Sequence, residues 1–256
     1  MSDTEPRNGA VRGAPVSDTE ICQEHAVPIV CRSLHRLAIR RRCIGEDGIV
    51  SRYPTAEPFL PDKRDLGTLA ETVQACRGCD LWEQASQAVF GAGRKRADVM
   101  LVGEQPGDQE DKQGAPFVGP AGRLLDEALE QAGIDRSRAY VTNAVKHFKW
   151  KARGKRRIHD KPSWSQIAAC RPWLLAELGA VSPRAVVLMG ATAAQSLLGR
   201  ELRVTRDRGR YQQDGLAPIA DVVVVTIHPS SILRGEPEER EAELAAFVED
   251  LRLAAA

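Results

Sequence analysis

The stretch ADVMLVGE, residues 97–104, decides the fold of this chain. Its apolar run is continuous from Val99 to Val102, which is typical of a strand that is buried on both faces of a sheet. The following segment GPAGRLLDEALEQAG, residues 119–133, places apolar residues at helical spacing, and AYVTNAV, residues 139–145, is a second strand. A strand, a helix and a strand in this order predict two parallel strands joined by a helical connection.

The same alternation continues through the rest of the sequence. Further helices are predicted over 66–76, 164–178, 191–199 and 238–254, and further strands over 185–190 and 221–227. Strands that alternate with helices predict a three-layer α/β/α fold around a central, mostly parallel four-stranded sheet. We assign this domain to residues 57–256. Residues 1–56 are expected to form a largely disordered N-terminal extension, because the first part is polar and rich in Gly, Pro and Asp.

Charge and composition limit the classes of function. The 256 residues carry a formal net charge of +1, which excludes a uniformly basic nucleic-acid coat, so any anion-binding surface must be local. The longest apolar runs, VMLV and VVVV, are of strand length, and the N-terminus lacks the apolar stretch of a secretory signal. We therefore expect a cytoplasmic protein without membrane contact, whose six cysteines do not form a disulfide framework.

Four of the possible metal ligands have a suggestive arrangement. Cys76 and Cys79 are separated by two residues, the spacing that lets two thiolates share one metal centre. His147 directly follows the second strand, and Cys170 lies in a predicted helix. From the residues alone zinc is favoured, since an iron–sulfur cluster usually takes four thiolates. The alternative is a pair of half-buried thiols and an unrelated core cysteine.

Polar residues collect where three of the strands end. In open parallel sheets ligands bind beyond the carboxyl ends of the strands, and GEQPGD, NAVKH and HPSS stand at these ends. The third strand ends in MGAT, which offers no candidate. Glu104 and Asp108 are candidate catalytic groups, and Phe117 is a candidate stacking platform. Asn143 offers a donor and an acceptor that suit the edge of a pyrimidine. His228, like Phe117 and Asn143, could equally have only a structural role.

The stretch RGKRRIH, residues 153–159, is the densest group of cations in the chain. Its basic residues Arg153, Lys155, Arg156 and Arg157 predict contact with a nucleic-acid backbone. The stretch ends on His159, which could contact a phosphate or act as a nucleophile. The pattern alone favours the phosphate contact.

Five separated blocks together resemble the uracil-DNA glycosylase superfamily. They are GEQPG, PFVGPAGRLLD, VTNAVKH, AACRPWL and HPSS, which match the iron–sulfur glycosylases in order and spacing over about residues 57–256. Gln105 in GEQPG and the insert that ends in KRRIH resemble the UdgX type in particular. The resemblance implies a structural [4Fe–4S] cluster, remote from the chemistry, held by Cys76, Cys79, His147 and Cys170.

The resemblance also implies roles at the strand ends. A glycosylase extrudes its target nucleotide into a pocket. Phe117 would stack on uracil, Asn143 would read its Watson–Crick edge, and the loop around Gln105 would contact it through backbone and side chain. His228 would bind O2 of the leaving base. The residues implied to hold the flanking phosphates are Ser230, Ser231 and Arg234, with Ile232 and Leu233 as possible wedges.

For His159 the resemblance favours a role as nucleophile over a phosphate contact. In UdgX-type proteins the histidine of KRRIH attacks the sugar C1′ and leaves the protein covalently attached to DNA, and Glu104 would orient it. The partner would be uracil-containing DNA, preferably single-stranded, bound by a monomer. Two alternatives stay open. One is a conventional hydrolytic enzyme in which Glu104 or Asp108 positions water, and the other is a non-catalytic binder of uracil-containing or abasic DNA.

Overall fold

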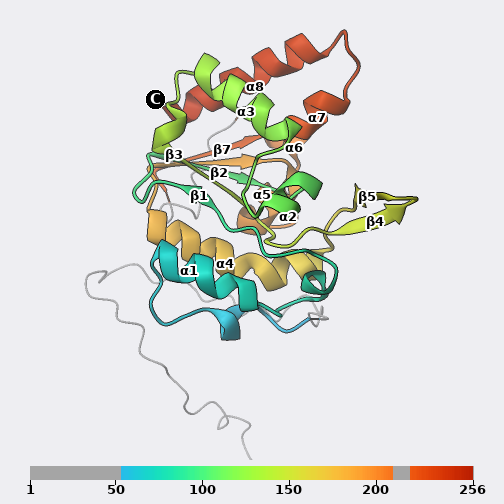
Figure 1. The fold of residues 1–256 in the computed structure, drawn as a ribbon. Helices are drawn as coiled ribbons and strands as arrows, with labels where there is room; N and C mark the ends of the chain where they lie inside the picture. The colour runs from blue at the N-terminus through green and yellow to red at the C-terminus, as the bar shows by residue number, and fades with distance from the viewer. Residues whose placement is uncertain (1–52, 210–219, 256) are drawn as a thin grey trace, which may run out of the picture. The chain divides into compact units, whose positions relative to one another are not determined.

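The computed structural model describes residues 53–209 and 220–255. Its central sheet has the strand order β1-β3-β2-β6-β7 (Figure 1). The parallel strands are β2 (Val99–Gly103), β3 (Ala139–Asn143), β6 (Ala185–Met189) and β7 (Val222–Thr226). They lie within the four predicted segments, so the mostly parallel sheet of an α/β fold is confirmed.

One further strand joins this sheet. β1 (Ala92–Gly93) pairs antiparallel with β3 at the sheet edge, so the sheet has five strands and not the predicted four. Two residues are too few for the alternation of polar and apolar side chains by which a strand is recognised in a sequence.

Helices cover both faces of the sheet (Figure 1). One layer contains α3 (Pro120–Gln131), α7 (Pro229–Arg234) and α8 (Arg240–Ala255). The other contains α1 (Leu66–Thr72), α4 (Trp164–Val181) and α5 (Ala191–Leu198). Two short helices, α2 (Asp108–Gln113) and α6 (Val204–Asp207), complete the α-helices of the described residues. The 3₁₀ turns are Glu57–Phe59, Val73–Ala75, Asp80–Glu83 and Arg136–Arg138.

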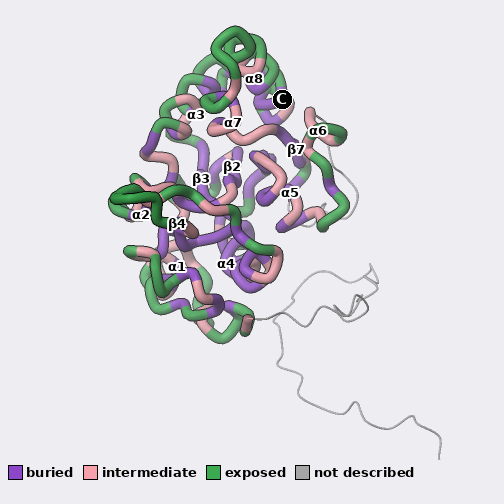
Figure 2. The backbone as a smooth tube through the Cα atoms, turned by 90° about the vertical axis from the view of Figure 1, so that its right-hand side faces the viewer, coloured by how far each residue is buried: buried purple, intermediate pink, exposed green. Residues whose placement is uncertain are grey.

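The core forms on both faces because successive side chains of a strand point to opposite sides. Met100 and Val102 of β2 belong to the same cluster as Leu174 of α4. Val99, the neighbour of Met100, belongs instead to a cluster with Leu129 of α3. The strands are therefore buried on both sides, as Figure 2 shows by their purple colour.

A two-stranded antiparallel hairpin projects from this body at the right of Figure 1. It consists of β4 (Trp150–Arg153) and β5 (Arg156–His159), which pair Trp150 with His159 and Arg153 with Arg156. Gly154 makes the turn with a φ of +59°, a conformation that favours glycine. The hairpin follows directly from the end of β3, so it emerges at the carboxyl edge of the sheet, where the polar motifs gather.

The packed domain begins ahead of the predicted boundary at residue 57. The Tyr53 hydroxyl donates to the Asp80 carboxylate at 2.6 Å, and Ala56 is buried with its backbone N–H bonded to the carbonyl of Ala169. Residues 1–52 of the predicted extension lie outside the described residues. Among residues 53–209 and 220–255, no helix combines the length and apolar character needed to cross a bilayer.

Candidate active site and metal centre

Three predicted pocket residues meet at Gly103, the last residue of β2. Gly103 stands beside Asn143 in the parallel register of β2 and β3. A side chain built at Gly103 would collide with Asn143 Oδ1, and its Cβ would lie 2.7 Å from Phe117 Cζ and 3.3 Å from His228 Nε2. The Phe117 and His228 rings are stacked with centroids 6.1 Å apart. An aromatic ring, an amide and an imidazole thus border one space that requires glycine.

The hydrogen bonds of His228 define what its ring presents to that space. Its Nδ1 accepts from the backbone N–H of Ser230 at 3.1 Å, so in the neutral ring the proton sits on Nε2, the nitrogen next to Gly103. Burial lowers the pKa of His228 to about 4. At neutral pH the side chain is therefore an uncharged donor whose N–H lies beside Asn143 Oδ1 and Phe117.

His159, at the end of β5, lies against Glu104. Its Nε2 is 3.2 Å from Glu104 Oε1, and the other carboxylate oxygen accepts a hydrogen bond from the Thr192 hydroxyl. Burial acts to raise the pKa of Glu104, but the hydrogen bonds from His159 and Thr192 outweigh it and hold the pKa below its usual value. The carboxylate is therefore ionised and directed at an imidazole that is itself half exposed. The Glu104 carboxylate can therefore accept a proton from the His159 ring.

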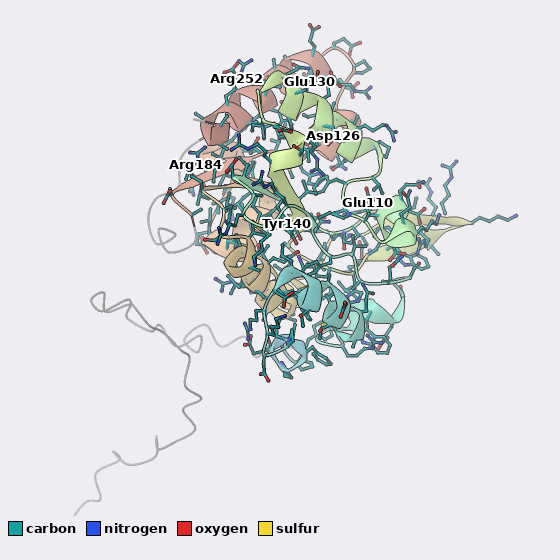
Figure 3. The ribbon with its side chains drawn as sticks, turned by 60° about the vertical axis from the view of Figure 1, so that its left-hand side comes forward. Glu110, Asp126, Glu130, Tyr140, Arg184 and Arg252 are labelled. Carbon is teal, nitrogen blue, oxygen red and sulfur yellow. The ribbon has the colours of Figure 1, made fainter. Side chains whose placement is uncertain are left out.

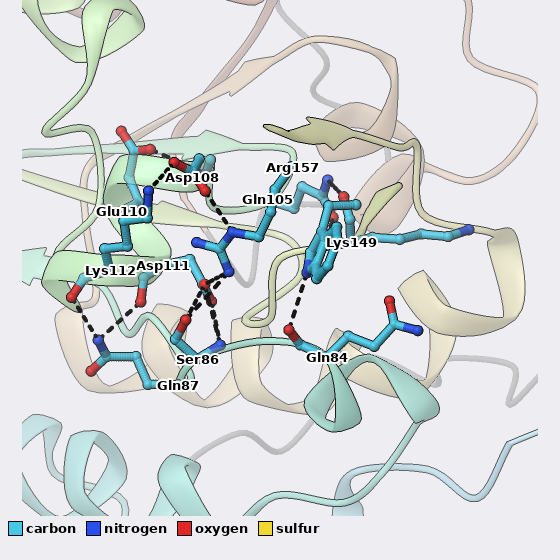
Figure 4. A network of polar contacts seen from close by, with 12 residues as sticks. Gln84, Ser86, Gln87, Gln105, Asp108, Glu110, Asp111, Lys112, Lys149 and Arg157 are labelled. Atoms are coloured by element: carbon cyan, nitrogen blue, oxygen red, sulfur yellow. Dashed lines mark hydrogen bonds and ion pairs between the residues drawn. The ribbon is translucent and has the colours of Figure 1, made fainter. Parts of the chain in front are cut away.

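Arg157 fastens the hairpin to α2, and Figure 4 shows its guanidinium among the acidic side chains. Its Nε is 2.6 Å from Asp108 Oδ1 and its Nη1 is 2.6 Å from Asp111 Oδ2. Asp111 is fully buried and also accepts from the backbone N–H and hydroxyl of Ser86. Arg157 and Asp108 therefore anchor the hairpin to α2. The contact of Arg157 with DNA and the catalytic role of Asp108 stay predictions.

Gln105 fastens the other part of the same hairpin (Figure 4). Its Nε2 donates to the carbonyls of Lys149 and Asp160, at 3.1 and 3.0 Å, and its Oε1 accepts from the Lys149 backbone N–H at 3.0 Å. These bonds engage both the nitrogen and the oxygen of the side-chain amide, and the contact of Gln105 with uracil stays a prediction. A side chain that joins the two ends of the hairpin holds His159 in place.

The cations of the hairpin tip have a different environment from Arg157. Arg153, Lys155 and Arg156 are exposed, and among the residues that the structure describes none of them forms an ion pair. Arg157 and His159 alternate along β5 with Arg156 and Ile158, so the two pairs point to opposite faces of the hairpin. Three of the four predicted backbone-contacting cations are therefore available to an anionic partner.

The four predicted metal ligands border one cavity. Cys76, Cys79, His147 and Cys170 line it together with Ala56, Gly78 and Ala169, and its empty volume is about 210 Å³ including the opening. Within the described ranges, no three His, Cys, Asp or Glu side chains converge on a single ion position. Three cysteines and one histidine are a ligand set that either a zinc ion or an iron–sulfur cluster can use.

The surroundings of the cysteines also fit bound thiolates. The Trp173 indole N–H lies 3.2 Å from Cys76 Sγ, and the Lys146 backbone N–H lies 3.3 Å from Cys170 Sγ. Such donors stabilise negative sulfur. Burial raises the pKa of Cys79 to about 11 and that of Cys170 to about 12, so both thiols would have to release a proton when they bind a metal. The residues present therefore fit a cluster held between the Cys76–Cys79 turn, the segment after β3 and α4.

Comparison with known proteins agrees with this geometry. Residues 90–252 match the model of the uracil DNA glycosylase superfamily. This chain belongs to that superfamily. A type-4 uracil-DNA glycosylase of Pyrobaculum aerophilum is 36% identical over 174 residues, which cover 66% of this chain and 85% of the relative. The type-4 enzyme of Thermotoga maritima is 36% identical over 67% of this chain and 84% of its own, and a type-5 uracil-DNA glycosylase of P. aerophilum is 30% identical over 52% and 62%.

In this member of the uracil-DNA glycosylase superfamily, the HPSS motif begins α7. The Ser230 hydroxyl lies 2.8 Å from His228 Nδ1 and accepts from Arg234 at 3.0 Å, while the Ser231 hydroxyl donates to the His228 carbonyl at 2.7 Å. Ser230 and Ser231 thus support His228, and their predicted phosphate contacts stay predictions. Ile232 is only 3% exposed and Leu233 is 37% exposed, so Leu233 is the more accessible of the two predicted wedges.

Sequence reasoning missed several residues that this superfamily member places at the site. Thr192 stands in the MGAT segment that seemed to offer no candidate, yet it binds Glu104. Asp111 holds Arg157 from a helix that was not predicted. Lys146 and Glu177 form a fully buried ion pair next to Asn143. A lysine in NAVKH, at the end of a buried strand, was the one local signal that could have pointed to such a pair.

Proposed function

We propose that this protein excises uracil from DNA and becomes covalently linked to the resulting abasic site through His159. The observation that carries the proposal is the Glu104–His159 contact on an anchored hairpin, next to Gly103, where Asn143, Phe117 and His228 meet. The hairpin is tied to the body by Gln105 and Arg157, so the imidazole is held in place before DNA arrives. Preorganised nucleophiles gain the most from such positioning.

The pocket would bind a uracil extruded from the strand. Phe117 supplies a ring to stack on, and the Asn143 amide supplies a donor and an acceptor for the Watson–Crick edge. Asn143, Phe117 and His228 all come close to Gly103, and a methyl group on the pyrimidine would have to fit among these three side chains. We infer that this excludes thymine.

The chemical step follows from the two histidines. The bond between the sugar C1′ and N1 breaks, and its electron pair leaves with the base. The Nε2–H of His228 stabilises the negative charge on the departing uracil, as a donor directed at developing charge in a dry site does. The lone pair of His159 forms the new bond to C1′, and the ring proton passes to Glu104. The product is a neutral N-alkyl imidazole, a poor leaving group, so the adduct persists.

A structural [4Fe–4S] cluster held by Cys76, Cys79, His147 and Cys170 belongs to this proposal. When bound, it would join three segments by metal–ligand bonds and so contribute to folding. The residues between His147 and Cys170 include the hairpin, so the same bonds would brace the segment that carries His159. Zinc is the alternative, and a brown protein with visible absorbance and about four irons per chain would distinguish the two.

A hydrolytic uracil-DNA glycosylase is the second candidate, because the relatives are named type-4 uracil-DNA glycosylases. In that case Glu104 would activate a water for attack on C1′, and His159 would contact the strand. Asp108 is a poor candidate for this base, since Arg157 and Lys112 both bind its carboxylate, at 2.6 and 2.5 Å.

One experiment separates these functions. The purified protein is mixed with a single-stranded oligonucleotide that carries one uracil, or with its thymine counterpart, and then boiled in SDS. A slower band that needs uracil supports covalent capture. An abasic product that accumulates over many turnovers without this band supports hydrolysis. Binding without either product supports a non-catalytic protein. The duplex form, run alongside, tests the proposed preference for single strands, which the exposed tip cations support.

A further inference from the structure

A buried ion pair lies next to the pocket and takes no part in the chemistry described above. Lys146 and Glu177 have side chains that are 1% and 0% exposed, and Lys146 Nζ contacts Glu177 Oε2 directly. Two opposite charges without access to water are stable only when further hydrogen bonds satisfy them. Burial of both charges costs desolvation free energy, which suggests that the ion pair has a role at this place in the fold.

The ammonium group of Lys146 also holds the end of β3. Its Nζ donates to the carbonyl of Asn143 at 2.7 Å and to the Thr142 hydroxyl at 2.8 Å. The Asn143 backbone is thereby bound by a charged donor, while its side chain reaches the space at Gly103. The cation thus acts on the residue that we propose reads the base.

Glu177 extends the same network to the sheet edge. Its carboxylate accepts from the Tyr140 hydroxyl at 2.9 Å, the Gly91 backbone N–H at 2.9 Å and the Thr142 hydroxyl at 3.0 Å. Burial, with the Glu177 charge beside it, raises the pKa of Tyr140, so the phenol stays protonated and donates. Figure 3 shows Tyr140 in the interior, away from Asp126 and Glu130 on the surface of α3. The hydrogen bonds to Lys146 and Glu177 therefore hold Gly91, Tyr140, Thr142 and the Asn143 carbonyl in place.

We propose that Lys146 and Glu177 are positioning residues for Asn143 and thereby set the selectivity of the pocket for uracil. This inference rests on the proposed function. The physical reason is that the amide of Asn143 can discriminate between bases only if its donor and acceptor keep fixed positions, and its backbone is held by the buried cation. A displacement of the order of 1 Å, caused from outside the reacting groups, can cost about 100-fold in rate.

The test is a double-mutant cycle between the pair and Asn143. K146M/E177Q removes both charges but keeps an amide oxygen for Gly91 and Tyr140. The single-turnover rate on uracil DNA is measured for the wild type, K146M/E177Q, Asn143→Ala and the combined variant. We expect K146M/E177Q to be about 10- to 100-fold slower. Adding Asn143→Ala to it should then cost much less than it costs the wild type.

A merely structural pair would give a different result. If the losses multiply, so that Asn143→Ala costs the same factor in both backgrounds, the inference is overturned. Asp250→Asn is the matched control, because it removes another buried carboxylate, bound to Thr226 and Arg208. The rate losses caused by Asp250→Asn and by Asn143→Ala should multiply when the two changes are combined. Thermal stability and iron per chain are measured for each variant, since Lys146 also donates its backbone N–H to Cys170.

Failure of the double variant to fold and lack of activity in the wild type have different consequences. If K146M/E177Q does not fold, Thr142→Val replaces it, because this change removes the hydroxyl that bridges the pair and leaves both charges in place. It should show the same kind of coupling to Asn143, and independent losses would reject the inference. If the wild type itself does not act on uracil DNA, the proposed function fails. If the wild type acts and the cycle shows no coupling, only the positioning role fails.

Discussion

Glu104 Oε1 lies 3.2 Å from His159 Nε2, although Glu104 follows directly after the first parallel strand and His159 ends a hairpin inserted after the second. The contact exists because the hairpin is fastened to the body by separate hydrogen bonds and ion pairs. It gives the chain a carboxylate and an imidazole in the geometry of a base and a nucleophile.

His159→Ser should abolish the SDS-stable adduct. The vacated space can admit water beside Glu104, so abasic product should now form with turnover. Denaturing gels and product assays on uracil DNA measure both. Lys155→Ser, on the exposed tip of the same hairpin, should keep the adduct. Continued cross-linking by the His159 variant would remove this residue from the mechanism.

Glu104→Gln should slow adduct formation by about 10²- to 10⁴-fold, the usual contribution of a positioned base. The amide keeps the size of the side chain but cannot accept the ring proton. The single-turnover rate on uracil DNA is the measurement. Thr192→Val serves as the comparison, because it removes one hydrogen bond to Glu104 and leaves the carboxylate, so its effect should be much smaller.

Arg157→Ala and Arg156→Ala should have different effects despite their adjacent positions. Loss of Arg157 frees the hairpin from Asp108 and Asp111, so adduct formation should slow while affinity for thymine DNA changes little. Loss of Arg156 should weaken binding to any strand and reduce the salt slope of log K by about 0.7. Salt titrations and single-turnover rates together test the difference. Equal salt effects for the two variants would contradict the assignment of Arg157 as an anchor.

Cys76→Ala should remove bound iron, visible absorbance and much of the stability of the domain. Iron analysis, absorption spectra and thermal unfolding measure these three properties. Cys43→Ala, which changes a cysteine outside the proposed ligand set, should remain brown and stable. A colourless wild-type protein that contains zinc would show that the four residues hold the other metal.

His228 should make stability depend on pH. Burial lowers its pKa to about 4 in the folded protein, whereas an unfolded histidine titrates near 6.5. Between these values the unfolded state binds more protons, so stability falls as pH decreases from 6.5 toward 4. By pH 5.5 the loss should be about 1.4 kcal/mol relative to pH 8. Denaturant unfolding at both pH values should show this loss in the wild type and a smaller one in His228→Gln.

The sequence also accounts for much of the site. Glycine at 103, asparagine at 143 and histidine at 228 stand at strand ends, and the carboxyl edge of a parallel sheet brings such residues together whatever the details of packing. The cavity bordered by Cys76, Cys79, His147 and Cys170 likewise agrees with a ligand set implied by motifs. Local signals sufficed for the strand-end residues because each is positioned by a strand that the sequence itself predicts.

The roles of Gln105, Asp108 and Arg157 were decided only by the tertiary structure. Each has the chemistry of a ligand- or DNA-contacting group, but each is used by a neighbour that is distant in sequence. The same is true of Lys146, whose partner Glu177 lies on α4 and is distant from it in sequence. Apolar periodicity and strand ends are properties of the local chain, so the sequence by itself determined the sheet and its functional edge. The pairing of buried charges depends on which segments meet in space, and only the folded structure decides that.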